Sequence, residues 1–265
     1  MRRLRSRLAV VFVLAAVVLT AACSSNTRPL YDPQALPSGP VGESIRLGHD
    51  IMQDTPKYLP RNVVADMSCA ACHVGVGTVK RGGSLVGLYG RFPQWNKRSK
   101  RVIMLQDRIG ECFLYSMNGT PPAYSSKAMI AIASYIAYLS RDVPGGAPQP
   151  KDDGFIVPLP SASPDVKHGG DLYAQKCAAC HQANGAGVHG SFPPLWGAAS
   201  FNAGAGMAHI DRMTGFVRFN MPQNAPGSLS LEDAYDISAW VLTHPRPTFN
   251  KARLIAPAPQ PASYF

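Results

Sequence analysis

The chain has 265 residues, of which 46% are hydrophobic and 16% are charged, with 24 glycines and 24 prolines. This length fits one or two domains, and so much glycine and proline is typical of a loop-rich fold. The formal net charge is +10, but four of the cations are arginines within the first seven residues. Without those four the charge is +6 (10 minus 4), which argues against a nucleic-acid partner and permits steering of small anions.

The first residues predict an export signal. Four arginines precede a twelve-residue apolar run, Leu8–Leu19, which is too short to span a bilayer and is typical of a secretory signal. The run ends in Leu19-Thr20-Ala21-Ala22-Cys23, which is similar to a lipoprotein processing site, so residues 1–23 are predicted to be a signal peptide with a lipid anchor at Cys23. The alternative is cleavage at a small-residue site, with Cys23 incidental. Both alternatives predict a periplasmic protein, with residues 24–40 as a tether.

Two copies of one short motif organise the rest of the chain. Ser68–His73 reads SCAACH and Lys176–His181 reads KCAACH, with Cys69 and Cys177 lying 108 residues apart. Cys-x-x-Cys-His is the attachment motif of c-type haem, in which both thiols form thioethers to the porphyrin and the histidine ligates the iron. A redox disulfide or half of a zinc site explains a single Cys-x-x-Cys, but not two copies that each carry a histidine directly behind. We therefore predict two covalently bound haem c groups, attached through Cys69, Cys72, Cys177 and Cys180 and ligated by His73 and His181.

The first motif lies in a predicted helical domain, residues 41–143. Val41–Gln53 can form a helix ahead of the motif, and Ser126–Leu139 a final helix that packs against it. Val74–Gly90 is rich in glycine and is predicted to be a loop. Arg91–Lys100 is basic, which suits either a solvated face or an anion site beside a redox centre.

Ser99–Met117 is predicted to form a helix, and it carries the most information about function in this domain. Its side chains recur at steps of three and four along one face, at Val102, Leu105, Ile109, Cys112 and Ser116. Arg108, Cys112 and Ser116 lie four residues apart, so a guanidinium, a thiol and a hydroxyl share one stripe of the helix.

The remaining sequence predicts a linker and a second domain. Residues 144–164 are rich in proline and glycine and form the linker, and residues 165–265 form the C-terminal domain with a Pro-rich tail. Asp165–Lys176 is its first helix, and Leu231–Thr243 is its last. The predicted fold class is all-α, with two cytochrome c-like haem domains joined by a Pro/Gly-rich linker.

The second axial ligand of each iron separates electron transfer from catalysis. In the second domain Met221 precedes a proline forty residues after His181, where a methionine ligand is expected, while Met207 and Met213 suit packing. In the first domain the residues alone leave the ligand open. A lone cysteine on an apolar face is usually a packing residue, but an arginine one turn away favours a thiolate. The candidates are Cys112, Met104, Met117 and Met129.

Three stretches of this sequence resemble the dihaem thiosulfate dehydrogenase (tetrathionate-forming) family: Arg98, the segment Asp107–Gly119, and Asn220-Met221-Pro222. The resemblance covers most of the chain after residue 41. It implies that the first haem has His/Cys ligation and is the active site, and that the second has His/Met ligation through Met221. It further implies that Cys112 is the distal ligand and catalytic thiol, in a pocket lined by Arg98, Arg108 and Ser116. Asn220 stands where some members have lysine.

The chemistry of that family suits these residues. Two thiosulfate dianions must approach each other, and arginine binds such oxyanions through a planar fork. The expected function is oxidation of two thiosulfate ions to tetrathionate, or the reverse, with electrons passing from the first haem to the second and on to a small cytochrome c. The alternatives are a plain two-domain electron carrier, with Met117 as ligand of the first haem, and a haem subunit of a larger sulfur-oxidising complex. We expect a monomer with no nucleic-acid partner.

Overall fold

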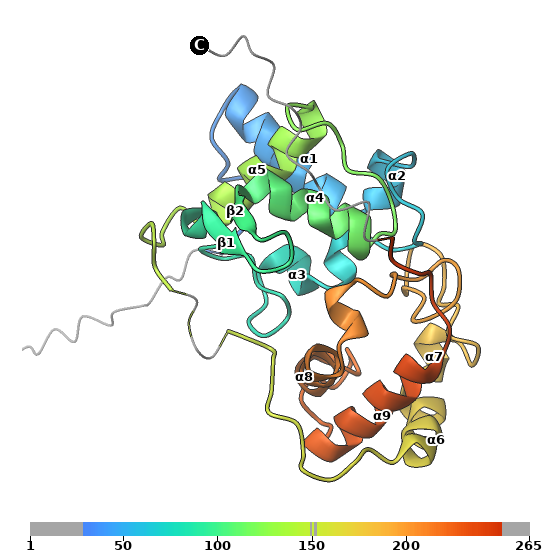
Figure 1. Ribbon diagram of the computed structural model, residues 1–265. Coiled ribbons are helices and arrows are strands. Elements are labelled where there is room, and N and C mark those ends of the chain that lie inside the picture. Colours follow the sequence, from blue (N-terminus) through green and yellow to red (C-terminus); the bar gives the residue numbers. More distant parts are fainter. Residues whose placement is uncertain (1–28, 149, 151–152, 251–265) are drawn as a thin grey trace, which may run out of the picture.

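The computed structural model describes residues 29–148, 150 and 153–250 and arranges them as two helical domains, one above the other in Figure 1. Helices dominate both domains, and the strands of the described residues form one short hairpin, so the predicted all-α class is confirmed. The predicted signal peptide and Cys23 lie outside the described residues. Within the described ranges, no helix combines the length and the hydrophobicity that a membrane crossing requires.

The elements follow the order in which the sequence repeats its motif. The first domain contains α1 (Pro40–Gln53), α2 (Thr55–Tyr58), η1 (Cys69–Ala71), α3 (Val74–Gly77), η2 (Tyr89–Arg91), β1 (Gln94–Asn96), β2 (Arg101–Ile103), α4 (Leu105–Tyr115) and α5 (Lys127–Leu139). The second contains α6 (Val166–Lys176), α7 (Ala178–His181), η3 (Gly206–Ala208), α8 (Ile210–Asn220) and α9 (Leu231–Thr243).

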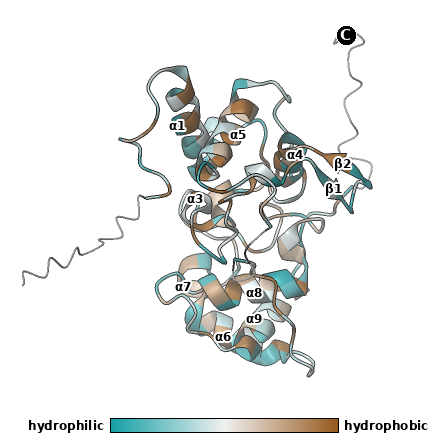
Figure 2. Ribbon diagram, turned by 90° about the vertical axis from the view of Figure 1, so that its left-hand side faces the viewer, coloured by the Kyte–Doolittle hydropathy of each residue, from teal (hydrophilic) through white to brown (hydrophobic). Residues whose placement is uncertain are grey.

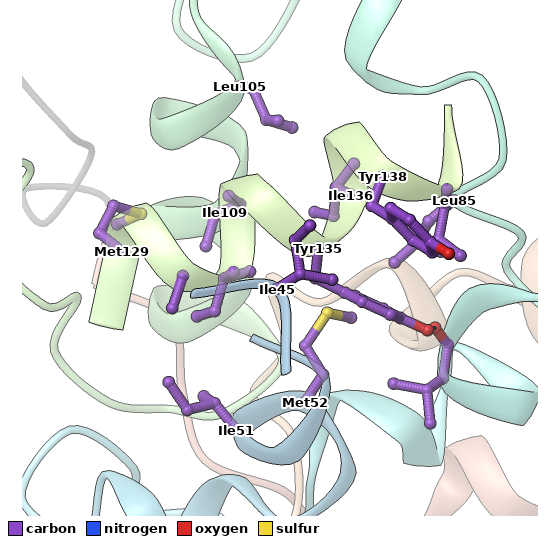
Figure 3. Close-up of a cluster of buried hydrophobic side chains, with 14 of the residues drawn as sticks. Ile45, Ile51, Met52, Leu85, Leu105, Ile109, Met129, Tyr135, Ile136 and Tyr138 are labelled. Atoms are coloured by element: carbon purple, nitrogen blue, oxygen red, sulfur yellow. Dashed lines mark hydrogen bonds between the residues drawn. The ribbon is translucent and has the colours of Figure 1, made fainter. Parts of the chain in front are cut away.

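The core of the first domain is built on the contact between α1 and α5, as predicted. Gly48 of α1 lies against the backbone of α5, where an added Cβ would overlap the carbonyl oxygen of Ala131. Figure 2 shows hydrophobic residues along α5. Tyr135 extends from α5 past Met52 of α1 (Figure 3), and its hydroxyl donates a hydrogen bond of 2.9 Å to the carbonyl oxygen of Val76. These contacts hold the segment that follows the first haem motif against the helical core.

The second domain repeats this packing with α6 and α9. Gly169 of α6 lies against α9, where a Cβ would overlap the carbonyl oxygen of Asp236. Both helices begin at side-chain caps: Asp165 accepts a hydrogen bond from the His168 amide, and Ser230 accepts one from the Asp233 amide. These caps confirm the two helices predicted for this domain.

Substitution of either close-contact glycine by alanine should unfold its own domain at lower temperature. A helical Gly→Ala change stabilises an exposed helix by about 1 kcal/mol. At Gly48 and Gly169 the new methyl group would overlap a backbone carbonyl, and overpacking of this kind destabilises by about 1–3 kcal/mol. We therefore expect lower thermal midpoints for Gly48→Ala and Gly169→Ala. Gly145→Ala is the control, because nothing lies within 4 Å of a Cβ added there; equal midpoints in all three variants would contradict the packing argument.

The prediction of one helix from Ser99 to Met117 is wrong at its start. Residues 101–103 form strand β2, which pairs antiparallel with β1, so Val102 faces Trp95 across the hairpin and is 59% exposed. The helix begins only at Leu105, because the carboxylate of Asp107 accepts a hydrogen bond of 2.9 Å from the Met104 amide. Val102 therefore does not belong to the helix face, and the hairpin replaces a helical turn beside the predicted site.

Helix α8 was not predicted, and it lies close to the contact between the domains. The Asn220 side chain, at the end of α8, donates a hydrogen bond of 2.8 Å to the carbonyl oxygen of Arg81 in the first domain. Asn202 donates from its side chain to the carbonyl oxygen of Leu114 at 2.7 Å and from its amide to that of Tyr115 at 3.2 Å. The C-terminal end of α4 is thereby fixed against the second domain.

Candidate active site

The first Cys-x-x-Cys-His motif presents its reactive atoms in the way that haem c requires. Both cysteines are free thiols, and the amide of Cys69 donates to the hydroxyl of Thr55 at 3.1 Å. The Nδ1 of His73 lies 2.6 Å from the carbonyl oxygen of Gly83, which can only accept. Nδ1 therefore carries the proton and Nε2 keeps its lone pair for a metal. A Cβ at Gly83 would overlap the backbone of Cys72, which explains the glycine at this close approach.

The second motif repeats the same chemistry. Cys177 and Cys180 are free, and the Nδ1 of His181 donates to the carbonyl oxygen of Pro193 at 2.9 Å. Burial lowers the pKa of His181, although the hydrogen bond to Pro193 opposes this shift, so the imidazole is held neutral. A neutral imidazole with a free Nε2 is the form that ligates iron. Both donor sets thus fit a haem c.

Cys112 lies on α4, close to the histidine of the first motif. Burial raises the pKa of the Cys112 thiol, but the positive charge of Arg108, together with the nearby imidazole of His73, outweighs burial and holds the pKa below its ordinary value. Burial raises the pKa of Cys69 and of Cys72 to about 12. Cys112 is therefore the sulfur of this domain whose surroundings favour a thiolate.

One nitrogen of Arg108 joins two groups on α4. Its Nη1 lies 3.5 Å from the sulfur of Cys112 and 3.5 Å from Oε2 of Glu111. Glu111 is 6% exposed and accepts a second hydrogen bond, of 2.8 Å, from the side chain of Asn96 in β1. Glu111 thus holds Arg108 against Cys112 and ties the hairpin to the helix.

Arg98 reaches the same region from the turn of the hairpin. The side-chain oxygen of Asn96 accepts hydrogen bonds from the amides of Arg98 and Ser99, which shapes this turn. The guanidinium of Arg98 then lies 4.0 Å above the ring of Tyr115, near the end of α4. Ser116 follows directly as the C-cap of that helix.

These groups line a cavity of about 290 Å³ with a strong excess of positive charge. Four cations, Lys97, Arg98, Arg108 and Arg212, face one carboxylate, Glu111. The walls come from the hairpin, from α4 and, across the domain contact, from η3 and the start of α8. A cavity of this charge suits small anions, and it lies beside Cys112 because Arg108 belongs to both.

The methionines that the sequence analysis named as candidate iron ligands differ in burial. Met117 and Met129 are each 2% exposed inside the hydrophobic core of the first domain, and Met213 is 5% exposed inside that of the second. Met104 is 47% exposed. Met221 follows α8 as its C-cap and is half-buried, and Met207 is also half-buried but packs against the core of the second domain. This distribution supports Cys112 and Met221 over the other sulfur atoms.

Sequence reasoning found Cys112, Arg98, Arg108 and Ser116, and the structure brings all but Cys112 into the cavity wall, with Cys112 one contact behind Arg108. Sequence reasoning missed three other residues that line the cavity: Glu111, Tyr115 and Arg212. Glu111 follows Arg108 at a spacing of three residues, which signals an ion pair on a helix. No local signal marks Arg212, because its proximity to α4 depends on how the two domains pack.

Comparisons with known proteins agree with this two-part structure. The family described as SoxA/TsdA, cytochrome c domain, matches residues 60–144, and that described as cytochrome C oxidase, cbb3-type, subunit III, matches residues 164–241. A thiosulfate dehydrogenase of Allochromatium vinosum is 41% identical over 257 residues, which cover 93% of this chain and 95% of that protein. One of Stutzerimonas stutzeri is 38% identical over 80% of this chain and 70% of that protein.

A solved structure agrees as well. The thiosulfate dehydrogenase TsdBA from Marichromatium purpuratum, in its as-isolated form, superposes with a TM-score of 0.77 at 33% identity. The match covers 82% of this chain and 49% of the chain in that structure. The two domains are cytochrome c domains, and the cofactors of this chain are two covalently bound haem c groups.

Proposed function

Because the chain belongs to the thiosulfate dehydrogenase family, we propose that it couples two thiosulfate ions to tetrathionate at the first haem, or catalyses the reverse reduction. The observation that carries this proposal is the position of Cys112. It lies between the iron-ligating histidine of the first motif and a cavity rich in guanidinium groups. A plain electron carrier needs neither the thiol nor the cations.

The proposed ligands rest on the two haem motifs, the surroundings of Cys112 and the family resemblance. Cys69 and Cys72 would attach the first haem, His73 and Cys112 would ligate its iron, and Arg98, Arg108 and Ser116 would bind the substrate. Cys177 and Cys180 would attach the second haem, and His181 and Met221 would ligate its iron. The haem groups supply two one-electron acceptors, from which electrons leave to an external carrier such as a small cytochrome c.

The reaction divides into two steps at Cys112. The Cys112 thiolate and the outer sulfur of one thiosulfate form a sulfur–sulfur bond, and two electrons leave as this bond forms. The outer sulfur of the second thiosulfate then attacks the sulfur that Cys112 holds. The bond to Cys112 breaks, tetrathionate leaves, and the thiolate is restored, with no net gain or loss of protons. Arg98 and Arg108 offset the repulsion between the two dianions.

The experiment that tests this function is a balance of substrate, electrons and product in the purified dihaem protein. With ferricyanide as acceptor we expect one tetrathionate and two ferrocyanide for every two thiosulfate consumed. With a reduced dye as donor, the reverse reaction should return two thiosulfate for each tetrathionate. Failure to form tetrathionate in either direction, with both haems attached, would overturn the proposal and favour the carrier interpretation.

Substitution of Met221 by alanine should alter the second haem and leave substrate binding intact. A thioether ligand raises the potential of a c-type haem, so its loss should lower the potential of one haem and change its absorption bands. Redox titration of the oxidised protein measures both effects, and the KM for thiosulfate should not change. Met213→Leu is the matched control, since Met213 is buried in the core. A titration that is unchanged in Met221→Ala would assign the ligand to another residue.

The cellular location, membrane anchor and oligomeric state of the protein are also proposed from the sequence. The arginine-rich start and apolar run direct the chain to the periplasm, Cys23 carries a lipid anchor, and the mature protein is a monomer. Mass spectrometry of the mature N-terminus tests the anchor. A terminus other than an acylated Cys23 would exclude it.

A further inference from the structure

The substrate cavity contains one arginine that belongs to the second domain. Arg212 lies in the first turn of α8, and it lines the cavity together with Arg98, Arg108 and Ser116 of the first domain. Next to it is Gly206 of η3, where an added Cβ would lie 3.4 Å from Nη1 of Arg212. Any side chain at position 206 would begin to cover the guanidinium, so the glycine leaves it accessible.

The guanidinium of Arg212 makes no hydrogen bond or ion pair with any residue in the described part of the chain. Two other arginines of the second domain are used structurally: Arg218 donates to the carbonyl oxygen of Gly227 at 2.7 Å, and Arg246 donates to that of Val241 at 3.0 Å. Arg212 also stands at a helix N-terminus, where the helix dipole disfavours a cation by about 0.3–1 kcal/mol. Local stability therefore does not account for an arginine here.

The first domain contributes three cations to the cavity, Lys97, Arg98 and Arg108, and one carboxylate, Glu111, so its net charge there is +2 (3 minus 1), too little for the proposed reaction. Two thiosulfate ions carry four negative charges. Arg108 is engaged by Cys112 and Glu111, and Arg98 lies over the ring of Tyr115. An uncommitted guanidinium on the opposite wall can bind a second sulfonate, because a sulfonate presents oxygens that match the planar fork of arginine.

On the basis of the function proposed above, we propose that Arg212 binds the sulfonate of the second thiosulfate, which is the distal sulfonate of tetrathionate. The first thiosulfate then lies beside Cys112, Arg98 and Arg108, and the second enters between α4 and α8. The substrate site is completed by the second domain.

The test compares Arg212→Gln and Arg212→Lys with wild-type protein in both reaction directions. We expect Arg212→Gln to raise the KM for thiosulfate and for tetrathionate about tenfold, equivalent to about 1.4 kcal/mol, with a smaller change in kcat. Arg212→Lys keeps the positive charge but loses the planar fork of the guanidinium. Its KM values should lie between those of wild type and those of Arg212→Gln. Inhibition by sulfate, which does not react, should weaken in parallel with these KM values.

Lys167→Gln is the matched control, because it removes one positive charge from the same domain at an exposed position on α6. Its KM should equal that of wild type, which separates direct binding from general attraction of anions. If wild-type protein forms tetrathionate but both Arg212 variants keep its KM and its inhibition by sulfate, this proposal is overturned and the proposed function stands. A fall in kcat with KM unchanged would also overturn it. If Arg212→Gln does not fold, Arg212→Lys alone decides the question by the same criteria.

Discussion

Cys112→Ala is expected to abolish the coupling of thiosulfate to ferricyanide reduction while both haem groups stay attached. Loss of a covalent nucleophile commonly lowers turnover by roughly 10³-fold or more. Neither attachment motif contains Cys112, so the haem content should remain at two. Steady-state turnover and a haem assay on the same preparations measure the two quantities together. Wild-type turnover in Cys112→Ala would make Cys112 a packing residue.

Cys112→Met separates ligation from catalysis at the same position. A thioether can replace a thiolate as axial ligand but cannot hold a thiosulfate sulfur in a bond that the second thiosulfate breaks. We therefore expect a six-coordinate first haem with a higher potential and very little turnover. Electron paramagnetic resonance of the oxidised wild-type protein should show one thiolate-ligated haem, and that signal should be lost in Cys112→Met.

Met117→Leu is the matched control for both variants, because Met117 is the ligand that a plain electron carrier would use. Met117 is 2% exposed in the first core, and an exchange of similar volume there usually destabilises by less than about 1.5 kcal/mol. We expect unchanged haem spectra and unchanged turnover. A change of ligand field in Met117→Leu, without one in Cys112→Ala, would favour the carrier interpretation.

The parts of this structure that the sequence predicted correctly are those determined by local interactions. α6 and α9 begin directly after Asp165 and Ser230, whose side-chain oxygens cap the first turn of each helix. The haem motifs are covalent requirements, so their spacing alone identifies the cofactor. The start of α4 could not be predicted by periodicity, because residues 101–103 continue the helical pattern while pairing as a strand with β1.

The composition of the cavity could not be predicted from sequence for a different reason. Arg108, Cys112 and Ser116 are close because a helix places residues four apart on one face. Arg98 approaches them only because Asn96 shapes the hairpin turn and bonds to Glu111. Arg212 approaches them because the two domains pack together, through contacts that include those of Asn202 and Asn220. These contacts depend on tertiary structure, and no periodicity in the sequence encodes them.

Arg108→Ala should lower kcat/KM for thiosulfate by roughly 100-fold or more, with a higher KM and a lower kcat. Loss of a charge-assisted hydrogen bond removes about 1.5–3 kcal/mol, and Arg108 makes such bonds both to Cys112 and, as proposed, to the substrate. Arg108→Lys should retain part of the rate, because it keeps the charge without the fork. Lys57→Ala, an exposed cation of the same domain, should behave as wild type.

The neighbouring Glu111 should contribute to the loss of kcat/KM in Arg108→Ala, and a double-mutant cycle measures that contribution. Without Arg108 the buried carboxylate of Glu111 keeps, among the residues that the structure describes, only its hydrogen bond from Asn96, and its charge then faces the incoming dianions uncompensated. A second substitution, Glu111→Gln, keeps the hydrogen bond from Asn96 and removes the charge. We therefore expect Arg108→Ala/Glu111→Gln to recover roughly tenfold of the lost kcat/KM, a coupling within the range found for contacting residues. Strictly additive losses in this double-mutant cycle would show that Glu111 does not act through Arg108. The defect of Arg108→Ala would then arise from the contacts of Arg108 with Cys112 and the substrate alone.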